Sequence, residues 1–291
     1  MWMKGCGQMG KTIVITGMTS GIGKALTLHL TAQGHHVIGI ARNQARLNTV
    51  KTLTETHSGK LTTVCADFKS LHSVKQACDY INRDFDQGID VLIHNAAIVP
   101  RRKLFSEDTV EMQYQVNHLV PIYMTHELYD LLVLKQGMMI ITSSNAHKQA
   151  RFSPLDLEAI KRYHPMRSYT RTKLYNLMFA LAFDDHLRST HNMRAFAVHP
   201  GLVKTEIGTK DTTFFYRLVW KLFTSRGIKE ADAIWTYDAL INHPKDYDQV
   251  YYYKKHAESY LSIANDKNAQ KTLLDDAVRR LNIPSIGKYK W

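Results

Sequence analysis

The sequence predicts an α/β protein built around one doubly wound, mostly parallel sheet with helices on both faces. Two observations indicate this fold. Short β-branched runs alternate with amphipathic stretches, and the first run leads through a glycine-rich turn into a helical pattern. Strands that alternate with helices become parallel neighbours, because each connecting helix crosses a face of the sheet. The 291 residues show no repeat or low-complexity linker, so we expect a single domain over residues 1–291.

The composition is that of an ordinary globular protein and excludes several classes. It is 44% hydrophobic and 22% charged, and no apolar run approaches the ~18 residues of a membrane span. Met1–Lys11 has neither the apolar core of a signal peptide nor an arginine-rich leader. Cys6, Cys65 and Cys78 show no metal-ligand spacing and cannot form an even set of disulfides. We therefore expect a cytoplasmic protein without a metal site.

The net charge of +12 indicates an anionic partner. The basic residues are dispersed along the chain and no nucleic-acid motif is visible, so we expect no nucleic-acid binding. An anionic cofactor, together with peripheral contact to an intracellular membrane, accounts for the charge better.

The first strand and its turn have the pattern of a phosphate-binding unit. Residues 12–15 are a β-branched run, and the helix after the turn closes at Gly34. Glycines in such a turn let backbone N–H groups and the positive helix end approach a pyrophosphate. The alternative is an ordinary tight turn. The residues that we expect to contact a cofactor here are Gly17, Thr19, Ser20, Gly21, Ile22 and Gly23.

The second and third strands carry the candidate contacts to the adenosine. The second, residues 36–40, ends just before Arg42, at the position that meets the adenosine ribose in a Rossmann unit. An acid there suits NAD(H), whereas a guanidinium suits a 2′-phosphate, so Arg42 favours NADP(H). The other interpretation, a solvated arginine, leaves NAD(H) open. The third strand, residues 62–67, ends at Asp67, where an adenine amino group would be reached.

Helical stretches around 70–85 and 106–133 bracket the fourth strand, residues 90–97. Asn117 lies in the second stretch, four residues before Pro121, which has no N–H to donate to the Asn117 carbonyl. We expect that carbonyl to bind a water in the site. The alternative is a kink with the carbonyl turned to bulk solvent.

A hydroxyl and a tyrosine–lysine pair are the candidate chemical groups. Ser144 follows the fifth strand, residues 138–142, and could donate to a substrate oxygen at the carboxyl edge of the sheet. Tyr169 and Lys173 are four apart in a helical pattern, so they share one face. We expect the nearby ammonium to lower the phenol pKa and so to aid proton transfer. Each signal is weak alone, since strand-end serines and such pairs on surface helices are common.

Together these motifs resemble the short-chain dehydrogenase/reductase family. The resemblance is strong over about residues 10–205 and returns in a strand at 250–253 and a helix near 267–281. The catalytic tetrad that it implies is Asn117, Ser144, Tyr169 and Lys173. The cofactor contacts that it implies beyond the glycine turn and Arg42 are Asp67, Asn95, Ala96, Tyr169, Lys173, Pro200, Gly201, Val203 and Thr205.

Within the family, the chain resembles the retinol dehydrogenase and related dehydrogenase/reductase branch. Residues 115–119, 143–147 and 198–201 carry this similarity, as does the long insert between Ser144 and Tyr169. Members of this branch mainly use NADP(H), in agreement with the arginine after the second strand.

The resemblance implies an NADP(H)-dependent oxidoreductase that interconverts a carbonyl and an alcohol, and leaves a homodimer open. Ser144 would hold the substrate oxygen and Tyr169 would transfer the proton. Lys173 would lower the tyrosine pKa and hold the nicotinamide ribose. Asn117 would secure a water that links Lys173 to solvent. The nicotinamide supplies the hydride.

The segment after the sixth strand, residues 194–198, is the expected substrate lid. We place the lid at about 206–245, the cofactor half mainly at 10–150, and the catalytic helix, lid and C-terminal strand and helix in 151–291. Residues 212–223 would form a helix with an apolar arc of roughly 240°. An apolar substrate, such as a retinoid, a steroid or a lipid-derived aldehyde or ketone, would cover this arc. The alternatives are a lipid surface and burial in the core.

Two other functions stay open. A cofactor-binding scaffold or redox sensor would use the same fold without turnover, but such a protein would be expected to lose a member of the tetrad. All four members are present. A peripheral lipid-binding protein would fit the charge and aromatic content, and would bind vesicles without consuming NADPH.

Overall fold

The computed structural model describes residues 10–161, 163–201 and 233–286. Its centre is a sheet with the strand order β3-β2-β1-β4-β5-β6-β7-β8, in which neighbours are parallel except for the antiparallel pair β7 and β8. The order reverses between β1 and β4, and open α/β sheets bind ligands at such a point. The strands are β1 (Thr12–Thr16), β2 (His36–Ala41), β3 (Lys60–Cys65), β4 (Val91–His94), β5 (Met138–Thr142), β6 (Arg194–Val198), β7 (Tyr251–Tyr253) and β8 (His256–Ala257).

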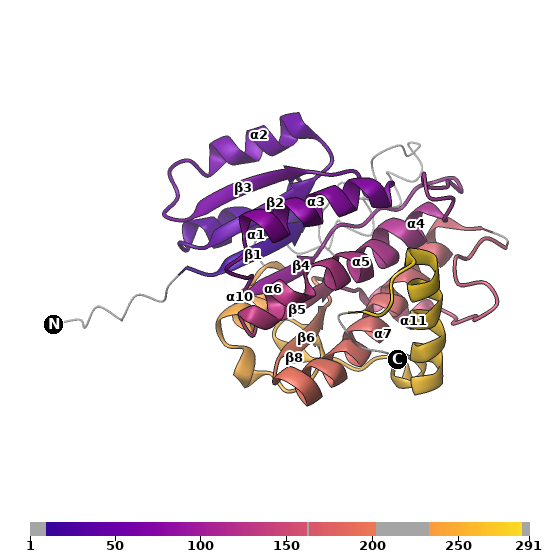
Figure 1. Ribbon diagram of the computed structural model, residues 1–291. Coiled ribbons are helices and arrows are strands. Elements are labelled where there is room, and N and C mark those ends of the chain that lie inside the picture. Colours follow the sequence, from indigo (N-terminus) through magenta and orange to yellow (C-terminus); the bar gives the residue numbers. More distant parts are fainter. Residues whose placement is uncertain (1–9, 162, 202–232, 287–291) are drawn as a thin grey trace.

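Helices cover both faces of this sheet (Figure 1). Helices α3, α5 and α7 pack on one face, with α11 against α7, and helices α1, α2 and α10 pack on the other face, so the predicted doubly wound sheet is confirmed. None of the helices in the described ranges is long and apolar enough to cross a membrane. The α-helices are α1 (Gly21–Ala32), α2 (Gln44–Leu53), α3 (Leu71–Asp84), α4 (Met112–Tyr114), α5 (Val120–Glu127), α6 (Tyr129–Leu134), α7 (Pro165–His191), α10 (Trp235–Asn242) and α11 (Lys267–Leu281).

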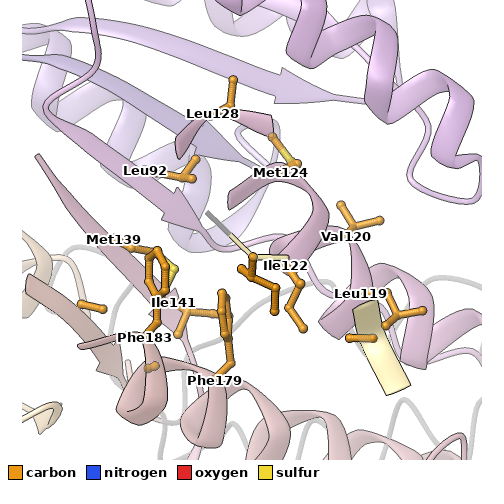
Figure 2. Packing of buried hydrophobic residues seen from close by; sticks show 14 of the residues in the cluster. Leu92, Leu119, Val120, Ile122, Met124, Leu128, Met139, Ile141, Phe179 and Phe183 are labelled. Carbon is orange, nitrogen blue, oxygen red and sulfur yellow. The ribbon is translucent and has the colours of Figure 1, made fainter. Parts of the chain in front are cut away.

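Alternate residues of the central strands enter two hydrophobic cores. In β1, Val14 belongs to one core, whereas Ile13 and Ile15 belong to the other. Figure 2 shows part of the first core, where Phe179 and Phe183 of α7 lie close to the side chains of β5. The two phenyl rings stack with their centres 5.4 Å apart. This packing fixes α7 against the sheet, and with it the residues of its first turns.

The prediction of one helix over residues 106–133 is wrong. A bridge between Phe105 and Glu111 closes a turn, and α4 begins only after it. The Glu111 carboxylate accepts from the Tyr114 N–H at 2.9 Å and caps the helix, so the helix start is set by this acid. A second break falls at Leu128, which separates α5 from α6.

Between α4 and α5 the chain widens into a π-helical stretch, Gln115–Leu119. The Val120 N–H donates to the Gln115 carbonyl, a step of five residues where an α-helix has four. Pro121 follows and cannot donate to the Asn117 carbonyl. Regular α-helix is therefore interrupted around Asn117, while the water on the Asn117 carbonyl stays a prediction.

Two predicted boundaries change. β3 ends at Cys65, so Asp67 lies in the loop after the strand and not in the strand itself. The described end of the predicted lid (206–245) contains α10, which packs into the core on the α1 side through residues such as Tyr237. That part of the segment is therefore core. The predicted helix at 212–223 lies outside the described residues.

The Thr16 hydroxyl fastens the end of β1 to the segment after β4. Its Oγ1 accepts from the N–H of Asn95 at 3.0 Å and of Ala96 at 3.1 Å, and the Asn95 amide donates to the Thr16 carbonyl at 3.0 Å. A Cβ on Gly17 would lie 3.0 Å from the Cα of Ala96. A Cβ on Gly23 would lie 2.3 Å from the Gly17 carbonyl oxygen. The packing of the protein itself therefore requires glycine at both positions.

Thr16→Val keeps the shape of the side chain but removes the acceptor of two backbone N–H groups. We expect the free energy of unfolding to fall by about 1–2 kcal/mol. A buried N–H left without an acceptor costs more free energy than an average hydrogen bond contributes. Urea denaturation measures this change. Thr16→Ser is the matched control and should retain most of the stability. Equal stability of the two variants would show that the hydroxyl does not hold this joint.

Candidate active site

A cavity of about 590 Å³ lies at the carboxyl ends of the central strands. Gly23 does not line it, because it packs against Gly17 under the turn. The structure thus brings the glycine turn and the ends of β2 and β4 to one hollow. The predicted cofactor residues that line it are Gly17, Thr19, Ser20, Gly21, Ile22, Arg42, Asp67, Asn95 and Ala96.

Arg42 and Asp67 line one part of this cavity together with Lys69. Arg42 directly follows β2, and its side chain is exposed. The Asp67 carboxylate accepts from the Lys69 N–H at 3.2 Å and lies 3.9 Å from Lys69 Nζ. Lys69 also pairs with Glu107 at 3.2 Å. Lys69 is therefore neutralised within the protein, whereas Arg42 has no carboxylate partner among the described residues.

Ser144, Tyr169 and Lys173 come together from β5 and α7. Ser144 follows β5 and begins the 3₁₀-helix η2 (Asn145–Gln149). Its hydroxyl lies near enough to the Tyr169 phenol to lower the pKa of that phenol. Lys173 is only 2% exposed, and its Nζ donates to the Thr142 carbonyl at 2.9 Å. The same Nζ lies 5.5 Å from the centre of the Tyr169 ring.

Asn117 is engaged through its side chain, which the sequence argument did not address. Its Oδ1 accepts from the Ile98 N–H at 2.8 Å, and its Nδ2 donates to the Ile98 carbonyl at 3.0 Å. The same Nδ2 lies 3.3 Å from the Thr172 hydroxyl oxygen, to which it donates. Asn117 therefore joins the loop after β4 to the catalytic helix.

The predicted lowering of the Tyr169 pKa is wrong for this structure. Burial raises the pKa of Tyr169 to about 12, and the Ser144 hydroxyl offsets only part of that rise. Burial also lowers the pKa of Lys173 to about 8. The cause is the same in both groups, because burial removes the hydration of the charged form. The phenol consequently keeps its proton at neutral pH.

Two buried side chains, which the sequence analysis did not place in the site, hold the backbone at Ser144 and Asn145. Tyr251 of β7 donates to Asn145 Oδ1 at 3.0 Å. His147 Nδ1 donates to the Ser144 carbonyl at 2.7 Å, and its ring meets the edge of Tyr251. Tyr251 is separated from Asn145 by 106 positions, so no local pattern could have indicated this contact.

A buried carboxylate, also missed, joins the start of α7 to α4. Glu111 Oε2 accepts from the Ser168 hydroxyl at 3.1 Å as well as from the Tyr114 N–H. The Glu111 N–H donates to Glu158 Oε2 at 2.8 Å. Burial raises the pKa of Glu111. Because Ser168 immediately precedes Tyr169, this carboxylate restrains the backbone that carries the phenol.

The segment after β6 contains Pro200 and Gly201, which do not line the cavity beside the glycine turn. Gly201 has a φ of +88° and donates its N–H to His199 Nδ1 at 3.3 Å. The His199 ring stacks on Tyr253 with ring centres 4.8 Å apart. Burial lowers the pKa of His199 to about 4, so the imidazole is neutral and can accept this bond. The remaining predicted cofactor contacts lie outside the described residues: Val203 and Thr205.

Known proteins resemble this chain over most of its length. Residues 11–214 match the sequence profile of the family described as short chain dehydrogenase. Retinol dehydrogenase 14 of Mus musculus is 31% identical over 212 residues, which cover 68% of this chain and 63% of that protein. Dehydrogenase/reductase SDR family member 13 of Homo sapiens is 31% identical over 212 residues, which cover 69% of this chain and 55% of that protein. The match therefore spans less than two thirds of either relative.

The solved structures show the same fold. L-sorbose reductase from Gluconobacter frateurii, solved with NADPH and L-sorbose, superimposes with a TM-score of 0.67 at 20% identity, over 84% of this chain and 94% of that one. The profile match and the two relatives identify the family as well as the fold. The chain belongs to the short-chain dehydrogenase/reductase family of oxidoreductases and resembles its retinol dehydrogenase branch.

Proposed function

We propose that this protein is an NADP(H)-dependent oxidoreductase that reduces a carbonyl to an alcohol and also catalyses the reverse reaction. The observation that carries the proposal is that Ser144, Tyr169 and the buried Lys173 lie close together at the carboxyl edge of the sheet. A phenol, a hydroxyl and an ammonium gathered in this way form a set suited to proton transfer. The nicotinamide would supply the hydride that such a reaction also needs.

Tyr169 is the proton donor in this proposal. Its pKa near 12 keeps the phenol protonated at neutral pH. It can therefore give its proton to a carbonyl oxygen as negative charge develops there. The Ser144 hydroxyl would donate a hydrogen bond to the same oxygen, since it already reaches the phenol.

Lys173 stabilises the phenolate that remains after proton transfer. Its pKa of about 8 leaves the lysine charged at pH 7. Because this pKa lies near the ambient pH, the ammonium can also pass a proton on. We further propose that Lys173 holds the nicotinamide ribose. The Asn117 carbonyl would hold a water between Lys173 and solvent, because the Asn117 side chain is already engaged with the protein.

The lining of the cavity carries the groups that would bind a dinucleotide. Helix α1 begins at Gly21 and its first N–H groups have no side-chain cap, so they can bind a phosphate. Gly17 and Gly21 have φ values of +76° and +53°, a backbone form that glycine adopts without strain. Arg42 supports a 2′-phosphate and therefore NADP(H), with NAD(H) as the less favoured alternative.

For the substrate we propose an apolar carbonyl compound of the retinoid, steroid or lipid-aldehyde type. The support is that one relative is named as a retinol dehydrogenase. A scaffold without turnover is disfavoured, because Asn117, Ser144, Tyr169 and Lys173 are all present.

Tyr169→Phe removes the proton donor while keeping the ring. We expect the rate of NADPH-dependent carbonyl reduction to fall by ~100-fold or more, as is typical for the loss of a general acid. The rate is measured as the fall of NADPH absorbance with each member of a panel of retinaldehyde, steroid ketones, quinones and short aldehydes. NADPH binding, followed by fluorescence, should be retained and serves as the control. Activity within a few-fold of the parent would remove Tyr169 from this role.

Arg42→Asp replaces a phosphate partner with a repulsive charge. We expect the binding free energy of NADPH to weaken by at least ~2 kcal/mol while that of NADH is unchanged or improves. Lys51→Asp makes the same change of charge on α2, away from the cavity lining, and should affect neither nucleotide. Equal affinity of the parent protein for NADH and NADPH would contradict the cofactor assignment.

A further inference from the structure

The loop after β4 forms part of the cavity wall and is fixed just before Arg101. Ile98 exchanges two backbone hydrogen bonds with the Asn117 side chain, at 2.8 and 3.0 Å. The Pro100 carbonyl accepts from the Tyr163 hydroxyl at 3.0 Å. The backbone that carries Arg101 and its neighbour is therefore held in place on the wall before any ligand binds.

Arg101 and Arg102 both line the cavity and are exposed. Neither has a carboxylate partner in the part of the chain that the structure describes, and the same holds for Arg42. Lys69, the other cation of the lining, is neutralised by two carboxylates, at 3.9 and 3.2 Å. Three guanidinium groups around one cavity are thus left without a counter-charge from the described protein.

The ligand that this charge favours is a polyanion. Adjacent guanidinium groups repel each other, and an anion between them turns that repulsion into attraction. Guanidinium forks match phosphate oxygens in bidentate, charge-assisted hydrogen bonds. A nicotinamide dinucleotide has a pyrophosphate, and NADP(H) has a further phosphate on the adenosine ribose, so it presents this chemistry within the same cavity.

We propose that Arg101 and Arg102 form a second phosphate-binding element, which contacts the cofactor phosphates from the loop after β4. The glycine turn and Arg42 contact them from the ends of β1 and β2. The inference rests on the proposed function, since it takes the ligand of the cavity to be a dinucleotide. The phosphates of the cofactor are then held from two segments that are distant in sequence.

The test is the dissociation constant of NADPH and of NADH, measured by nucleotide fluorescence on the full chain. The variants are Arg101→Ala, Arg102→Ala and the double substitution. Lys103→Ala is the matched control, because it removes the same charge from the same loop at a residue that does not line the cavity. The Lys103 Nζ instead lies 5.8 Å from the centre of the Phe105 ring. All of these side chains are exposed, so the unfolding temperatures should match that of the parent.

Each arginine substitution should weaken NADPH binding about tenfold, the double substitution should weaken it further, and Lys103→Ala should change it by about twofold or less. Equal losses for NADPH and NADH would assign the arginines to the pyrophosphate. A loss confined to NADPH would assign them to the 2′-phosphate. Both outcomes support the inference.

Arginine variants that bind NADPH as tightly as Lys103→Ala does would overturn the inference. If the parent protein binds NADPH in the same titration, the proposed function stays intact. A parent protein that binds neither nucleotide would overturn the proposed function, and the inference with it. The two failures are therefore distinguishable in the same titration.

Discussion

The candidate active site depends on one ammonium held almost entirely away from water. Lys173 donates from Nζ to the Thr142 carbonyl, and the Ser143 hydroxyl donates to the Lys173 carbonyl at 2.8 Å. These two bonds run in opposite directions between α7 and the end of β5, so they fix both the position and the rotation of the helix. The Tyr237 hydroxyl bonds to the Thr142 hydroxyl at 2.8 Å and supports the same corner from α10. Since burial already disfavours the lysine charge, small changes in the surrounding charges alter its protonation.

Much of the fold could be predicted because its strands and longest helices have strong periodic signals. The strands β1, β2, β5 and β6 are continuous apolar or β-branched runs, and α11 coincides with the predicted residues 267–281. Helix α2 has no such signal, because only Leu47 and Val50 of its side chains are buried. The single helix predicted after β4 failed for another reason. Apolar spacing continues through the break at Leu128, so periodicity alone cannot locate that break. Residues 106–109 are all polar, and a polar run there fits the first turn of a helix as well as the turn that precedes Glu111.

Site residues could be predicted where the relevant partners are close in sequence or follow a strand directly. Their supports could not, because they arrive from distant segments: Tyr251 reaches Asn145 across 106 positions, and Glu111 reaches Ser168 across 57. The predicted lowering of the Tyr169 pKa was wrong for a related reason. Spacing indicates that an ammonium is near, but the pKa depends on how much water the folded chain removes from both groups.

The hydrogen bonds of Asn117 have a consequence for how two ligands would influence each other. Its amide is bonded on one side to Ile98, at the base of the cavity wall, and on the other to Thr172, one turn along from the phenol. The wall and the catalytic helix are therefore parts of one mechanical frame. If a molecule bound at the wall restrained the helix under Tyr169 through these bonds, the two binding events would be coupled. Thermodynamic linkage then requires reciprocity: whatever binding at the wall adds to affinity at the phenol, binding at the phenol adds equally to affinity at the wall.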